Sequence, residues 1–74
     1  MTEKFLPLSA MEKIMKRVGA TRVSDKSKLA LKRVLEDIAD SISRMAIDFA
    51  RHAGRKTVKA EDVKLAIKQF ENKF

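Results

Sequence analysis

The residues most suited to chemistry are the cations and the hydroxyl group of one short segment, Arg51-His52-Ala53-Gly54-Arg55-Lys56-Thr57-Val58-Lys59-Ala60-Glu61-Asp62. Guanidinium and ammonium groups on a loop between two helices are suited to neutralising phosphate oxygens. The chain has 74 residues and a formal net charge of +7. We therefore expect it to bind a polyanion, and the pattern favours duplex DNA.

The same residue types give little support to catalysis or to metal binding. His52 is the single histidine of a chain without cysteine, so it has no second soft ligand and no neighbouring nucleophile motif. Glu36, Asp37 and Asp40 lie close together in a predicted helix, but three such acids usually form a solvated face. We expect no catalytic residue, no metal and no cofactor.

Chain length and composition predict a small protein that needs a partner. One domain of this size, residues 1–74, lies near the lower limit for a self-sufficient hydrophobic core. Without cysteine, oligomerisation is the remaining means of stabilisation. No apolar run approaches the roughly 18 residues of a membrane span, and the apolar stretch before Ser9 is too short for a signal peptide. We expect a soluble cytoplasmic protein without a membrane partner.

Three helices are expected to position the candidate residues. The first is predicted at about residues 9–18, starting at a capping box formed by Ser9 and Glu12 and ending at Gly19. Its apolar positions recur at helical spacing. Phe5 and Phe74 are expected to cover helix ends.

The second and third helices flank the basic segment. The second is predicted at about residues 25–53, where Ser24 caps its start and Gly54 ends it. The third is predicted at about residues 60–71, with acidic side chains near the positive end of its dipole. Lys59 stands where serine or threonine would be a better cap.

An apolar stripe follows the second predicted helix, formed by Leu31, Val34, Leu35, Ile38, Ile42, Met45 and Phe49. This helix would be about 43 Å long, whereas a compact globule of this chain length has a diameter of roughly 29 Å. Each large apolar side chain contributes about 1.5 to 3 kcal/mol when buried. Leaving half of the stripe in water would forfeit about as much as the whole stability of a domain. We therefore predict that two chains cross along this stripe.

The order of short helix, loop, long helix, loop and short helix resembles the histone fold, and more narrowly an archaeal histone. The resemblance rests on Ala20-Thr21-Arg22-Val23-Ser24 in the first loop and on the segment from Ala50 to Asp62, which is close to the family signature in order and spacing. It implies an all-α histone fold with two chains interlocked as a handshake homodimer. Arg22-Val23 of one chain would then pair with Thr57-Val58 of the other.

The resemblance also implies the residues that would contact DNA. Arg22 would enter the minor groove, Lys56 and Thr57 with their backbone amides would bind phosphates, and Lys13 and Lys16 would add contacts from the first helix. Such binding depends on counterion release and on the cost of bending DNA. We expect it to be strongly salt-dependent and largely independent of base sequence.

A second implied group of residues would join one dimer to the next. In the family this contact is a four-helix arrangement, which here would combine Phe49, His52, Asp62 and Leu65 of facing dimers. Arg55 and Asp62 are also expected to form a salt bridge that fixes the second loop rather than contacting DNA.

The predicted function is that of a chromatin protein which wraps and compacts double-stranded DNA on the chromosome, in the nucleoid. Its partners would be DNA, further copies of itself as homodimer, tetramer and higher oligomers, and, as further candidates, paralogous histones. One alternative is a histone-fold subunit of a transcription-type heteromeric complex, which homodimerisation of the pure chain would count against. Another is a basic amphipathic peptide on an anionic membrane surface, although acids scattered along the long helix weaken it.

Overall fold

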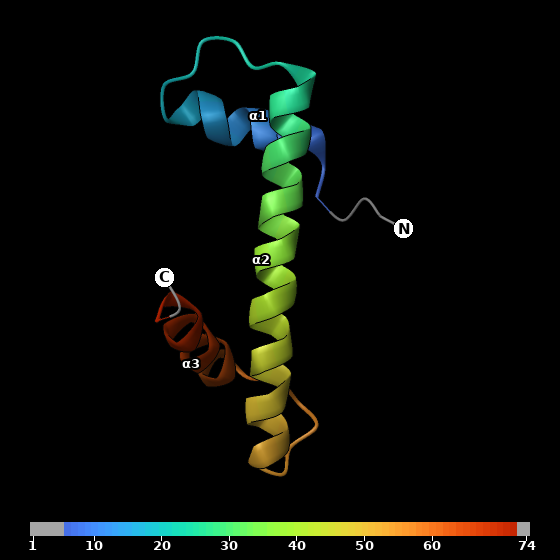
Figure 1. Cartoon of the computed structure of the whole chain (residues 1–74), viewed down its shortest axis with the longest axis vertical. Helices are drawn as coiled ribbons and strands as arrows, with labels where there is room; N and C mark the ends of the chain where they lie inside the picture. The colour runs from blue at the N-terminus through green and yellow to red at the C-terminus, as the bar shows by residue number, and fades with distance from the viewer. Residues whose placement is uncertain (1–5, 73–74) are drawn as a thin grey trace. The chain divides into compact units, whose positions relative to one another are not determined.

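The computed structural model describes residues 6–72. They form three α-helices, namely α1 (Leu8–Arg17), α2 (Asp25–His52) and α3 (Ala60–Glu71) (Figure 1). No β-strand occurs among these residues, so the all-α layout of a long helix between two short ones is confirmed. The helices that the structure describes contain no stretch long and apolar enough to cross a membrane. Phe5 and Phe74 lie outside the described residues.

The start of α1 differs from the sequence prediction. The helix begins at Leu8, and Pro7 is its N-cap residue in an extended conformation. No side chain caps this helix, so the capping box predicted at Ser9 is wrong. Proline is favourable at a helix start because its φ is already fixed and its missing N–H would have no partner there. The Pro7 carbonyl accepts a hydrogen bond from the Ala10 amide at 3.2 Å, and Glu12 turns to lysine partners instead.

Both loops begin with the same helix-ending geometry. Gly19 and Gly54 have φ angles of 121° and 75°, in the region that favours glycine. After α1, the Gly19 amide bonds to the Lys16 carbonyl at 3.1 Å, and the Ala20 amide bonds to the Met15 carbonyl at 3.0 Å. After α2, the amides of Gly54 and of the residue that follows repeat this pattern, both at 2.9 Å. This is the Schellman motif, which sets the direction in which each loop leaves its helix.

The starts of α2 and α3 are held by side chains of two different kinds. At α2, Ser24 Oγ accepts the Ser27 amide at 3.1 Å, and so the predicted serine cap is present. At α3, the Lys59 ammonium has no lone pair with which to cap the helix. The Asp62 carboxylate instead accepts the Lys59 backbone N–H at 2.8 Å. Asp62 thereby links the second loop to the helix that follows it.

The chain divides into two compact units, Met1–Asp37 and Ile38–Phe74. In the first, α1 lies across the N-terminal part of α2 (Figure 1) and Met11 is buried. In the second, α3 lies beside the C-terminal part of α2, and the buried apolar residues described there are Ala46, Ala50 and Ala66. All the apolar residues that are buried in the described part of the second unit are thus alanines, whereas the first unit buries the larger Met11.

Several large apolar side chains remain accessible in both units. Val34, on the predicted stripe of α2, is 52% exposed, and Leu65 of α3 is 50% exposed. Other large hydrophobic side chains with more than a third of their surface exposed are Leu8, Ile14, Val18, Leu29, Ile47, Val58, Val63 and Ile67. Ten accessible large apolar side chains among the described residues, in a chain this short, favour burial against a further chain.

Candidate nucleic-acid interface

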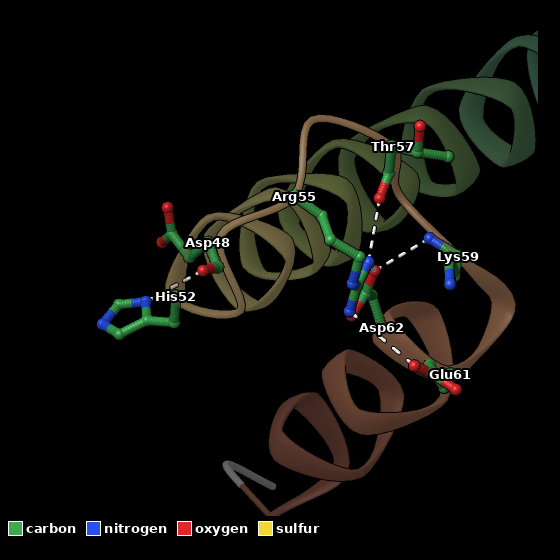
Figure 2. Close-up of polar contacts among 7 residues, drawn as sticks. All are labelled: Asp48, His52, Arg55, Thr57, Lys59, Glu61 and Asp62. Atoms are coloured by element: carbon green, nitrogen blue, oxygen red, sulfur yellow. Dashed lines mark hydrogen bonds and ion pairs between the residues drawn. The ribbon is translucent and has the colours of Figure 1, made fainter.

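One ion pair fixes the second loop, residues 53–59. Arg55 Nη1 and Nη2 donate to Asp62 Oδ2 and Oδ1, both at 2.9 Å, and Nη1 also donates to the Thr57 carbonyl at 2.9 Å (Figure 2). The bond from the Lys59 amide completes the set of donors on Asp62. The ion pair expected from the sequence is therefore present, and it ties the loop backbone to α3.

The charges of this pair stabilise one another. The Asp62 side chain is 2% exposed and that of Arg55 is 24% exposed. Hydrogen bonds from Arg55 and then from the Lys59 backbone lower the pKa of Asp62 to about 2. The Asp62 carboxylate in turn raises the pKa of Arg55. Because both groups stay charged near neutral pH, the bidentate geometry that orders the loop persists there.

The ordered loop leaves its predicted DNA-binding residues at the surface. Lys56 and Thr57 are both exposed, on the segment between Arg55 and the start of α3. Lys56 also lines a surface hollow of about 450 Å³ together with Ile47, Ala50, Arg51, Arg55 and Val58. Cations gathered at one hollow are suited to an anionic ligand.

The first loop and α1 carry the other predicted DNA-binding cations. Arg22 is exposed on the first loop, and within the described chain its guanidinium has no hydrogen-bond or ion-pair partner. Lys13 and Lys16 are exposed on α1 and line a hollow of about 560 Å³ together with Ser9, Glu12 and Arg17. These three cations belong to the first compact unit, whereas Lys56 and Thr57 belong to the second.

The residues expected between dimers differ in their environment. His52 is exposed, and its Nδ1 lies 2.9 Å from the Asp48 carbonyl oxygen; Figure 2 shows its ring pointing away from the Arg55–Asp62 pair. Phe49 is half-buried and lines the same hollow as His52, and Leu65 is half-exposed on α3. Asp62, by contrast, is buried and already accepts three hydrogen bonds within its own chain.

The structure adds a lysine and carboxylate cluster that the sequence did not reveal. Lys28 Nζ lies 3.3 Å from Glu12 Oε1 and 3.1 Å from Asp25 Oδ1, while Glu12 Oε2 also pairs with Lys16 at 3.1 Å. The pairs within one helix are visible as spacings of three or four residues. The link from Glu12 to Lys28 joins α1 to α2, so it depends on how these helices pack.

Exposed cations on two loops and one helix can bind a phosphate polymer by charge and by hydrogen bonding. Within residues 6–72, no cluster of three or more His, Asp or Glu side chains could hold a metal ion. Each of the two compact units therefore carries exposed cations that are suited to an anionic backbone.

Comparisons with known proteins agree with this geometry. The model of the family described as "histone-like transcription factor (CBF/NF-Y) and archaeal histone" matches residues 4–67. Over 63 residues, the chain is 49% identical to one of the subunits of archaeal histone HAN1 from Thermococcus zilligii. It is 46% identical over 63 residues to probable archaeal histone 3 of Methanocaldococcus jannaschii. Each match covers 85% of this chain and 94% of the relative.

Proposed function

This chain belongs to the family of histone-like transcription factors and archaeal histones, and from that membership we propose that it wraps and compacts duplex DNA as dimers that assemble further. The chain is a DNA-binding chromatin protein, located on the chromosome in the nucleoid. Wrapping, compaction and the assembly of dimers are the proposed means by which it acts.

The ion pair of Arg55 and Asp62, which orders the second loop, is the observation that carries the proposal. The bidentate pair of Arg55 and Asp62 holds the loop backbone while Lys56 and Thr57 stay exposed. A preorganised loop loses little conformational freedom when it binds, so more of its interaction energy appears as affinity. Such a loop fits the regularly repeating phosphates of a duplex.

Handshake pairing would cover the accessible apolar surface and bring the two loops together. Val34 and Leu65 are each about half exposed in the single chain. In the proposed homodimer, the α2 helices cross, and Arg22-Val23 of one chain meets Thr57-Val58 of its partner. Both segments lie outside the helices, so helical hydrogen bonds do not use their backbone groups, and the Thr57 carbonyl accepts a bond from Arg55.

Paired loops would then form the DNA-binding edge of the dimer. We assign Arg22 to the minor groove, Lys56 and Thr57 to phosphates, and Lys13 and Lys16 to further contacts from α1. Binding of this kind releases counterions and bends DNA without reading base edges. DNA that bends at low energetic cost would be preferred.

Larger oligomers would form through the C-terminal end of α2 and the neighbouring part of α3. Phe49, His52 and Leu65 would supply the surface of this contact, and the accessibility of His52 and Leu65 supports the assignment. Asp62 would take part from beneath that surface, while its carboxylate also holds Arg55. Paralogous histones could replace one copy of the chain in such assemblies.

The alternative of a component of a transcription-type heteromeric complex is not favoured, because both of these relatives carry the name of archaeal histone. A peptide at an anionic membrane surface would float with liposomes, whereas a chromatin protein would remain with DNA.

Nuclease digestion of long linear DNA bound by the purified chain tests the proposal. Wrapping should protect fragments whose lengths increase in regular steps. The double variant Arg22→Ala, Lys56→Ala should lose protection at a salt concentration at which the equally charged control Lys64→Ala, Lys68→Ala retains it. An unprotected smear from the wild-type chain at low salt would rule out wrapping.

A further inference from the structure

Glu12 is an acid inside the row of cations on α1. It lines one surface hollow with Lys13, Lys16 and Arg17, and its Oε2 lies 3.1 Å from Lys16 Nζ. Hydrogen bonds from Lys16 and then from Lys28 lower the pKa of Glu12, so it keeps its negative charge near neutral pH. A carboxylate in this position repels an approaching phosphate and occupies one of the cations that the phosphate would use.

The two lysine partners of Glu12 differ in accessibility. Lys16 contacts Oε2 and its side chain is 50% exposed, whereas Lys28 contacts Oε1 and its side chain is 16% exposed. Lys28 is also held by Asp25 at 3.1 Å. The exposed Lys16 ammonium is therefore free to change partner, while the more enclosed Lys28 remains beside the carboxylate.

We propose that Glu12 sets the DNA affinity of the α1 face by competing with phosphate for Lys16, an inference that rests on the proposed DNA-binding function. In the free protein Glu12 holds both lysines. On DNA, Lys16 transfers to a phosphate oxygen, and Lys28 alone neutralises Glu12. Breaking the ion pair between Lys16 and Glu12 thus offsets part of the attraction to DNA. The contacts of α1 with DNA are therefore weaker, and more readily released, than the number of cations on α1 implies.

The variant Glu12→Gln tests this competition against Glu71→Gln, which changes the net charge equally at the exposed end of α3. Fluorescence anisotropy with a labelled duplex at several salt concentrations measures affinity and its salt dependence. Glu12→Gln should bind about 3- to 10-fold more tightly than the control because no ion pair has to break, with a similar salt slope because Lys16 engages a phosphate in both proteins. Equal affinities for the two variants would refute the proposal.

A double-mutant cycle separates competition from simple charge addition. Lys16→Gln should reduce affinity more in the Glu12→Gln background than in the wild-type chain, because only there is Lys16 fully available to DNA. Additive effects of the two substitutions would overturn the assignment. Circular dichroism establishes that each variant has the helical content of the wild type.

Lys28 supplies a second test that leaves α1 unchanged, for use whether or not Glu12→Gln folds. Lys28→Gln leaves Glu12 with Lys16 as its lysine partner, so it should weaken DNA binding more than Lys68→Gln, which removes an exposed cation from α3. Equal losses would contradict the competition. If the wild-type chain itself does not bind DNA, the proposed function fails; if it binds and these differences are absent, only the role of Glu12 fails.

Discussion

At the scale of single residues, Asp62 shows how one buried charge can organise a loop. A carboxylate that is 2% exposed would be unfavourable without donors, and here Arg55 and the Lys59 amide supply three hydrogen bonds. Removing Arg55 would leave the buried Asp62 carboxylate with only one of these three hydrogen bonds, the one from the Lys59 amide. The loop residues that we propose to bind DNA therefore depend on an ion pair that does not itself need to contact DNA.

The lowered pKa of Asp62 predicts a specific response to acid. Its folded value of about 2 lies below the ordinary value of 3.8, so the folded state binds the proton less readily than the unfolded state. The resulting stability is fully present above about pH 4 and is lost as pH falls toward 2. Urea unfolding of the wild type and Asp62→Asn across this range should show a smaller loss in the variant. Parallel profiles would contradict the role given to Asp62.

We predict that affinity for DNA depends on the position of Arg22 and not only on the number of cations in the chain. Arg22→Ala should weaken binding by about tenfold through loss of a groove contact and its released counterions, while Lys64→Ala should have a smaller effect. Affinity for one duplex at fixed salt measures both. Equal losses would mean that the total charge, and not the place of Arg22, determines affinity.

Sequence spacing predicts some of these side-chain pairs and misses others for a physical reason. Arg55 and Asp62 flank one short loop, so their approach follows from local geometry. Glu12 and Lys28 lie 16 residues apart, on two helices whose packing a spacing rule does not contain. The cap predicted at Ser9 is wrong because the proline before it already provides the backbone geometry of a helix start.

At the scale of elements, glycines and caps determine where each helix stops and how each loop leaves it. The Schellman motifs at Gly19 and Gly54 and the cap at Ser24 all follow from residue type. These signals are local, which explains why the order of the helices could be predicted so well. The starts of α1 and α3 depend instead on Pro7 and on an acid three residues into the helix.

Gly54 is the element-scale position with the clearest energetic consequence. Its φ is 75°, and a Cβ added there would meet nothing within 4 Å. Gly54→Ala should therefore lower the free energy of unfolding by about 1 to 2 kcal/mol through backbone strain alone. Urea denaturation at one protein concentration measures this, and Gly54→Asn is the matched control because asparagine tolerates the left-handed region better. Alanine as stable as glycine would refute the strain.

At the scale of the whole molecule, accessible apolar residues indicate that the functional unit contains more than one chain. Val34 and Leu65 are each about half exposed, and burying such a side chain contributes about 1.5 to 3 kcal/mol. Several of them together approach the roughly 5 to 15 kcal/mol that stabilises a typical domain. The length of the apolar stripe predicts the need for a partner from sequence alone, whereas the detailed contacts of a dimer require two chains.

Sedimentation equilibrium of the DNA-free chain tests the central claim, that two chains pair and thereby align the cationic loops. The account predicts a folded species with twice the 8.4 kDa mass of one chain, and unfolding midpoints that rise with protein concentration. A well-folded, helical monomer of 8.4 kDa in dilute buffer would contradict it.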